Sequence, residues 1–191
     1  MKRIFIVLLA LCLCLGTVAC AEEAAFVFRG QIRWGMSPEE VMDIEQNLLG
    51  KGPDYNSAEA ETSMMAPGFQ QLGYRESEVD GFAGPVSYVF YDGKLSMFSF
   101  GIAEPSQETK EQLLGALEAG YRKEENPEED RLWSASGKVQ GKEHTPGDKP
   151  RDELYVFTCE NTVIWYFTRL DKPAVTVLNA SEEYVNSVAG E

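Results

Sequence analysis

Two helix patterns, each followed by a run of strand patterns, constrain this chain most. The first helix is expected to begin at Ser37, because a proline at the first helical position and a glutamate at the third complete a capping box. The second is expected to begin at Pro105-Ser106 and to end at Gly120 as C-cap. The strand patterns lie at 71–78, 86–91 and 95–102 after the first helix, and at 131–139, 154–159, 162–169 and 174–178 after the second. This succession predicts an α+β fold.

Short turns between neighbouring strand patterns favour an antiparallel sheet. Asp92-Gly93 is a strong hairpin signal, and Glu160-Asn161 is short enough for a second hairpin. We expect one antiparallel sheet with the two main helices packed on one face. An additional strand is predicted at Phe26–Arg33.

The repeated succession suggests half-units at 26–102 and 103–178, followed by a C-terminal tail at 179–191. They represent either a tandem helix-plus-strands duplication or an ordinary α+β domain. Two segments have no firm prediction: 54–69 is interpreted as a loop with one short helical turn, and 140–151 as a polar excursion.

The N-terminus has the pattern of a signal peptide at 1–21, with two basic residues before an uncharged apolar run. The run is too short to span a bilayer, so no transmembrane helix is expected in the mature chain, and 22–191 is predicted to be one exported domain of bacterial type. Ala19-Cys20-Ala21 fits ordinary cleavage, whereas Thr17-Val18-Ala19-Cys20 resembles an imperfect lipobox. In the second interpretation Cys20 carries a lipid, and the domain is tethered to the envelope.

Charge narrows the class of partner. After removal of 1–21, the chain keeps 15 basic and 31 acidic residues, a net charge of −16. Such a charge repels nucleic acids and anionic lipid surfaces, and it favours a basic protein or a cation. The alternative is that the charge serves solubility outside the cell.

Residues typical of catalysis or metal binding are scarce. Cys159 lies in a strand pattern and is expected to be a core thiol, and His144, the single histidine, is expected to be a solvated loop residue. The acidic stretch 124–130 lacks the pattern of a calcium-binding loop. We therefore predict no catalytic residue, no cofactor and no metal site, and the protein is expected not to be an enzyme.

Aromatic residues recur along the predicted strands and suggest a binding surface, because protein interfaces favour tyrosine, tryptophan and phenylalanine. The candidates are Tyr88, Phe98, Tyr155 and Trp165. The alternative for each of them is a place in the core.

A resemblance rests on residues 32–41, which read Ile-Arg-Trp-Gly-Met-Ser-Pro-Glu-Glu-Val. This passage from a strand through Trp-Gly-Met into a helix is similar to the opening of small exported SmpA/OmlA-like and β-lactamase-inhibitor-protein-like domains. The hairpin at 88–95 is also similar, and the resemblance spans roughly 26–178. It implies helix-plus-strands units and protein binding without catalysis, either in outer-membrane assembly or in inhibition across a concave sheet.

The favoured function is therefore an exported, non-catalytic domain that binds another protein. An envelope lipoprotein that acts as a structural or assembly accessory through Cys20 is the second hypothesis. A hydrolase built on a pair of carboxylates is the third, since acidic residues are plentiful although no spacing supports a pair.

Overall fold

A computed structural model describes residue 29 and residues 31–60, 65–125, 129–139, 141, 151–169 and 173–189. The described helices are α2 (Pro38–Leu49), α3 (Gln107–Gly120), α4 (Glu129–Val139) and α5 (Glu182–Ala189). The strands are β1 (Tyr55–Asn56), β2 (Phe69–Tyr74), β3 (Glu78–Val79), β4 (Phe82–Ala83), β5 (Val86–Tyr91), β6 (Lys94–Ala103), β7 (Arg122–Lys123), β8 (Arg151–Cys159), β9 (Thr162–Arg169) and β10 (Ala174–Ser181). The predicted α+β class is confirmed.

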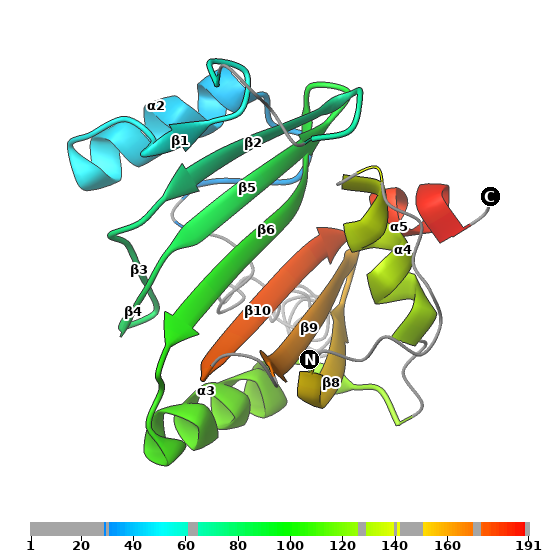
Figure 1. Cartoon of the computed structure of the whole chain (residues 1–191). Helices are drawn as coiled ribbons and strands as arrows, with labels where there is room; N and C mark the ends of the chain where they lie inside the picture. The colour runs from blue at the N-terminus through cyan, green and yellow to red at the C-terminus, as the bar shows by residue number, and fades with distance from the viewer. Residues whose placement is uncertain are drawn as a thin grey trace, which may run out of the picture.

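The main sheet has eight strands in the order β1-β2-β5-β6-β10-β9-β8-β7, and every neighbouring pair is antiparallel (Figure 1). Its centre is the pairing of β6 with β10, in which Val177 lies opposite Phe100. The strands β3 and β4 form a separate two-stranded ribbon beside the sheet. Strands from the first half of the chain therefore lie between one edge of the sheet and its centre, and strands from the second half lie between the centre and the other edge.

The helix α2 begins as its sequence predicts. Ser37 is the N-cap, its hydroxyl accepts a hydrogen bond from the Glu40 backbone N–H, and the Glu40 carboxylate accepts one from the Ser37 backbone N–H at 2.8 Å. The helix ends at Gly50, whose φ of 68° is the left-handed conformation that glycine adopts without strain. The capping box therefore sets the start of α2.

The two predicted hairpins are present. Asp92 and Gly93 have φ angles of 49° and 74°, as a type I′ turn between β5 and β6 requires. In the turn from β8 to β9, Glu160 also has a positive φ, and Cys159 pairs with Thr162. These turns fix the register of the strands that they join.

Side chains on the two faces of the sheet belong to two core clusters. Along β9, Ile164 and Tyr166 belong to the first cluster, whereas Val163 and Trp165 belong to the second, because successive residues of a strand point to opposite faces. The helices α2 and α3 contribute buried residues to the first cluster, and α4 and α5 contribute to the second. The described helices therefore cover both faces.

The strand predicted at 131–139 is wrong, because this segment forms α4. Ala135 and Val139 are four residues apart and are buried in the second core cluster. The Tyr184 hydroxyl of α5 donates a hydrogen bond to the Ala135 carbonyl oxygen at 2.8 Å. Packing against α5 therefore decides the helical state of a segment whose sequence pattern is ambiguous.

The segment predicted as a C-terminal tail at 179–191 forms regular secondary structure over its described part. The strand β10 continues to Ser181, and α5 follows it directly. Val185 in α5 is fully buried, so the segment completes the second core cluster. Its apolar residues Tyr184, Val185 and Val188 recur at helical spacing, which is the pattern of an amphipathic helix.

Three smaller predictions need correction. The helix α3 has Tyr121, not Gly120, at its C-cap position. Residues 31–36 contain turns and no strand, while most of the strand predicted at Phe26–Arg33 lies outside the described residues. Within 54–69, the described part includes the short strand β1.

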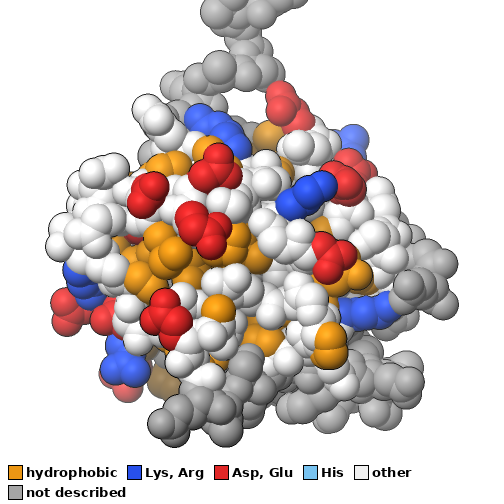
Figure 2. Space-filling view, turned by 90° about the horizontal axis from the view of Figure 1, so that it is seen from above, with side chains coloured by type: hydrophobic (Ala, Val, Ile, Leu, Met, Phe, Trp, Pro, Cys, Tyr) orange, Lys and Arg blue, Asp and Glu red, His pale blue; other side chains and the backbone are white. Residues whose placement is uncertain are grey.

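The described surface carries many acidic side chains. Seen from above, Asp and Glu side chains lie around exposed hydrophobic side chains on this face (Figure 2). No helix among the described residues combines the length and apolarity that crossing a membrane requires.

Candidate functional site

A groove of about 710 Å³ lies between the C-terminal end of α2 and the ends of β2 and β6, beside the β3–β4 ribbon. This region is on the left of Figure 1. The lining residues are Arg29, Leu48, Leu49, Arg75, Glu76, Ser77, Glu78, Ala83, Gly84, Pro85, Ile102 and Ala103. The groove is wide and open to solvent.

A buried polar cluster lies next to the groove. Glu45 of α2 is fully buried, and its Oε1 atom accepts a hydrogen bond from the Tyr88 hydroxyl of β5. The Arg29 guanidinium, which also lines the groove, lies with its Nε atom 3.4 Å from the same oxygen. Burial of an ionisable pair is costly unless its hydrogen bonds are satisfied. The cost therefore depends on whether the other polar atoms of Arg29 and Glu45 have partners.

Four buried polar atoms around the groove have no hydrogen-bond partner within the described part of the chain. They are Arg29 Nη1, Glu45 Oε2, the Tyr74 hydroxyl and the Ser77 hydroxyl. The ring of Tyr74 packs edge-on against that of Tyr88, with centroids 6.1 Å apart, so Tyr74 lies near the Glu45–Tyr88 pair, whereas Arg29 and Ser77 line the groove. Buried polar atoms normally find partners, and unpaired ones indicate a place for water or for a bound group.

Burial changes the acidity of this cluster. The pKa of Glu45 lies above its ordinary value, because loss of solvent outweighs the hydrogen bond from Tyr88 and the charge of Arg29, which both lower it. The pKa of Tyr88 is also raised, first by burial and then by the negative charge of Glu45. The Tyr88 hydroxyl therefore stays protonated and acts as a donor to Glu45.

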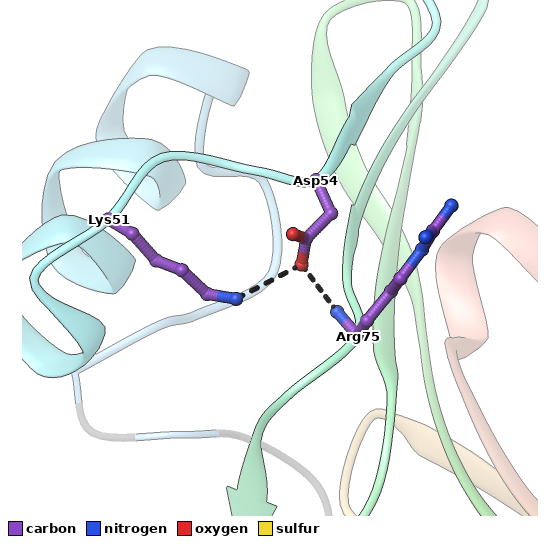
Figure 3. A network of polar contacts seen from close by, with 3 residues as sticks. All are labelled: Lys51, Asp54 and Arg75. Atoms are coloured by element: carbon purple, nitrogen blue, oxygen red, sulfur yellow. Dashed lines mark hydrogen bonds and ion pairs between the residues drawn. The ribbon is translucent and has the colours of Figure 1, made fainter.

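The rim of the groove is held by a polar network (Figure 3). The Asp54 carboxylate accepts a hydrogen bond from the backbone N–H of Arg75 at 2.7 Å and lies 3.3 Å from the Lys51 ammonium. The backbone N–H of Arg75 is the largest cause of the lowered pKa of Asp54, and Lys51 adds to it. This network fixes the start of the Arg75–Glu78 segment, which forms one wall.

Backbone contacts tie residues Gly84 and Pro85 to this wall and to β6. The Gly84 N–H donates to the Ser77 carbonyl oxygen at 2.9 Å, and the Gly101 N–H donates to the Pro85 carbonyl oxygen at 3.0 Å. A side chain at Gly84 would overlap the Gly101 carbonyl oxygen. Glycine is therefore needed where this segment crosses β6.

A second hollow, of about 390 Å³, is polar and lies at the β8–β9 turn. Its lining residues are Arg122, Thr158, Glu160, Thr162, Val163 and Glu182. Thr162 accepts a hydrogen bond from the Trp34 indole at 2.8 Å, and Arg122 pairs with the neighbouring Glu124. These pairings make this hollow the weaker candidate.

The aromatic residues predicted as a binding surface do not lie together on an exposed face. Tyr88 and Phe98 are fully buried in the first core cluster, and Trp165 is buried in the second, on the other side of the sheet. Tyr155 is half-buried, with the Lys123 ammonium 4.2 Å from its ring centroid. Strand alternation separates these side chains, so the alternative of core positions holds for the first three.

The remaining sequence-based candidates are placed as follows. Cys159 is half-buried at the end of β8 and packs against the first core cluster. Cys20 and His144 lie outside the described residues. Within the described ranges, no three His, Cys, Asp or Glu side chains gather into a potential metal site.

Sequence reasoning missed Arg29 and Glu45. Glu45 follows Val41 by four residues on the apolar side of α2. A carboxylate at this spacing in the sequence indicates a buried charge that needs a partner. Arg29 carried no such signal, because its place depends on how the chain before α2 packs.

No family model, curated protein or solved structure matches this chain. The resemblance based on residues 32–41 therefore stays a prediction.

Proposed function

We propose that this chain is an exported, non-catalytic domain that binds another protein, and that a segment of the partner occupies the groove beside α2. The observation that supports this most is an open groove whose lining combines apolar side chains with the exposed guanidinium of Arg75. A partner that covers the apolar side chains and pairs with Arg75 would gain affinity and orientation at once.

The apolar part of the groove supports a polypeptide partner. Leu48 has 50% of its surface exposed, and Leu49 and Ile102 line the same groove. Protein interfaces combine an apolar centre with polar groups at the edge, and this groove has both.

The charge of the mature chain supports a basic partner. Its net charge of −16 would attract a positively charged protein and speed the encounter. The resemblance to the SmpA/OmlA-like and β-lactamase-inhibitor-protein-like domains supports the same class of function, because those domains bind proteins without catalysis.

We also propose that the half-units 26–102 and 103–178 arose by duplication. In support, each half contains a long helix and four strands of the main sheet, β1, β2, β5 and β6 in one half and β7 to β10 in the other. From each edge of the sheet to its centre, the strands follow their order in the chain: β1, β2, β5 and β6 from one edge, and β7, β8, β9 and β10 from the other. The two halves meet at the β6–β10 pair. The helices α2 and α3 contribute to the same core cluster, as two equivalent helices on one face would.

A carboxylate-based hydrolase is less well supported by this site. Its natural acid would be Glu45, since burial raises the pKa of this side chain. Yet Glu45 is fully buried and is committed to Tyr88 and Arg29, so a substrate in the groove would meet Arg29 first. A general acid must reach the group that it protonates.

The proposed function is tested by affinity capture with the full chain, produced and exported in its own host. We expect a stoichiometric partner with the wild type and with Gln112→Arg on the exposed side of α3, and its loss with Leu48→Arg in the groove. Retention of the partner by Leu48→Arg would contradict binding in the groove. Hydrolysis of a glycan panel that disappears in a single Asp or Glu variant would instead support the hydrolase.

An envelope lipoprotein is the second candidate, favoured by the sequence Thr17-Val18-Ala19-Cys20. The intact mass of the protein isolated from its host decides this point. A chain that begins at Glu22 without lipid would indicate release from the membrane. A chain that begins at an acylated Cys20 would indicate a tethered assembly accessory.

A further inference from the structure

The ion pair between Arg29 and Glu45 joins the chain before α2 to the interior of the domain. Glu45 is fully buried on α2, and its Oε1 atom lies 3.4 Å from the Nε atom of Arg29, whose side chain is only 10% exposed. Among the described residues, Glu45 is the one acid within ion-pair distance of Arg29. The buried charge of Arg29 therefore depends on Glu45 for its compensation.

The chain is attached independently of this pair from Ile32 onwards. Ile32 is fully buried in the first core cluster, and the Trp34 indole donates a hydrogen bond to the Thr162 hydroxyl oxygen at 2.8 Å. Arg29 precedes these contacts, and its carbonyl oxygen accepts a hydrogen bond from the Ile32 N–H at 3.1 Å. The Arg29 side chain can therefore leave Glu45 while the remainder of the domain stays folded.

The ionisable side chains that interact with Glu45 within the described ranges come from three segments. Arg29 comes from the chain before α2, Tyr88 from β5 and Tyr74 from β2. Both tyrosines have raised pKa values, first because of burial and then because of the charge of Glu45, so they stay protonated. Burial also raises the pKa of Glu45, whereas Tyr88 and Arg29 lower it. Glu45 is therefore the member of this cluster that changes charge as the pH falls.

We propose that Arg29 and Glu45 form a pH-sensitive clasp, in which ionised Glu45 holds Arg29 against α2 and protonated Glu45 releases it to solvent. Protonation removes the countercharge of a buried guanidinium, and exposure to water relieves the cost of that state. The released side chain leaves the groove wall to which it belongs, and the chain before Ile32 loses its tie to α2. The clasp makes both features depend on pH.

Release of Arg29 and stability of the whole fold respond differently to protonation of Glu45. The folded protein holds this proton more strongly than the unfolded chain does, because burial outweighs the charge of Arg29. Within the folded protein, the pair with Arg29 lowers the pKa of Glu45, so loss of the pair raises it further. Protonation at this site therefore favours the folded chain over the unfolded one, and within the folded chain it favours the released position of Arg29.

Nuclear magnetic resonance of the full mature protein, labelled in its arginine and glutamate side chains, tests the clasp. The order parameter of the Arg29 Nε–Hε bond and the carboxyl carbon shift of Glu45 are measured between about pH 8 and about pH 4. We expect an order parameter near about 0.85 at high pH and below about 0.6 in acid, with the same midpoint for both signals. An Arg29 side chain that keeps its order at every pH would overturn the clasp.

Two variants assign the change to Glu45. Glu45→Gln keeps the size of the side chain without its charge, so Arg29 should be mobile at every pH. Glu76→Gln removes an exposed carboxylate that lines the same groove, and it should keep the wild-type transition. Loss of the transition in Glu76→Gln, or its persistence in Glu45→Gln, would assign the proton to another group and overturn the proposal.

Two further variants decide the question if Glu45→Gln does not fold. Tyr88→Phe removes a hydrogen bond that lowers the pKa of Glu45, so the midpoint for Arg29 should move to higher pH. Arg29→Gln should raise the pKa of Glu45, because docking of Arg29 and binding of the proton are linked. An unchanged value in either variant would contradict the clasp. These measurements involve no partner protein, so the clasp and the proposed function fail separately.

Discussion

The Tyr88 hydroxyl on β5 donates a hydrogen bond to the fully buried Glu45 carboxyl group on α2. This contact joins the first helix to the sheet beneath it and places Glu45 beside Arg29 at the groove. The position of the groove wall formed by the end of α2 therefore depends on a polar contact inside the protein.

Removal of the Tyr88 hydroxyl is expected to destabilise the fold. In Tyr88→Phe a buried carboxyl oxygen loses its donor, so the free energy of unfolding should fall by about 1–3 kcal/mol. Tyr91→Phe, at a side chain that is 37% exposed, should change it by less than about 0.5 kcal/mol. Urea unfolding of both variants checks this, and similar values for the two would contradict the role assigned to the contact.

Glu45 is expected to make stability depend on pH. Because burial raises its pKa above the ordinary value of 4.5, the folded protein holds this proton more strongly than the unfolded chain does. The resulting stabilisation is fully present below pH 4.5 and is lost as the pH rises through the folded-state pKa. The stability of Glu45→Gln relative to wild type should therefore improve with rising pH. Parallel unfolding curves over this range would show that Glu45 has no raised pKa.

Asp54 is expected to act in the opposite direction. The backbone N–H of Arg75 and the charge of Lys51 lower its pKa below 3.8, so its stabilising effect is present above that pH and is lost as the pH falls through the folded-state pKa. Asp54→Asn should lower the Tm at neutral pH and lose this difference in acid. Thermal unfolding at several pH values measures it, and a Tm difference that is the same at every pH would contradict the proposed network.

Gly84 is expected to tolerate no side chain. In Gly84→Ala the new Cβ atom would overlap the Gly101 carbonyl oxygen, and because that obstacle is backbone, either this segment or β6 must shift. We expect a loss of several kcal/mol or failure to fold. Gly115→Ala in α3 is the matched control: no described atom lies within 4 Å of its Cβ position, and the change should stabilise the helix by about 0.5–1 kcal/mol. A mild effect at Gly84 would show that the groove wall is adaptable.

Local signals in the sequence predicted the elements that depend on local chemistry. The capping box at Ser37 and the turn at Asp92-Gly93 determine α2 and the β5–β6 hairpin, because the residues that decide each conformation are adjacent in the chain. By contrast, residues 131–139 became helix α4 through contact with α5, which lies about fifty residues later. Such contacts between distant segments are not visible in a local pattern.

The candidate site shows the same limit. Residue type favours Tyr88, Phe98 and Trp165 as binding residues, but the alternation of side chains along the strands directs them into two separate cores. Glu45 was detectable as a carboxylate on an apolar helix face, whereas its pairing with Arg29 and Tyr88 joins three segments separated in sequence. Composition and charge favour the hypothesis of protein binding, but only the folded arrangement suggests the groove beside α2 as its location.

Site-specific photo-crosslinking tests most directly whether the groove is the binding site. A photoreactive phenylalanine analogue is placed at Leu48, in the groove, or at Gln112, on the exposed side of α3, in the full chain produced by its own host. We expect one discrete protein adduct at position 48 upon irradiation, and none at position 112. Absence of an adduct at position 48, or the same adducts at both positions, would contradict binding of a partner in the groove.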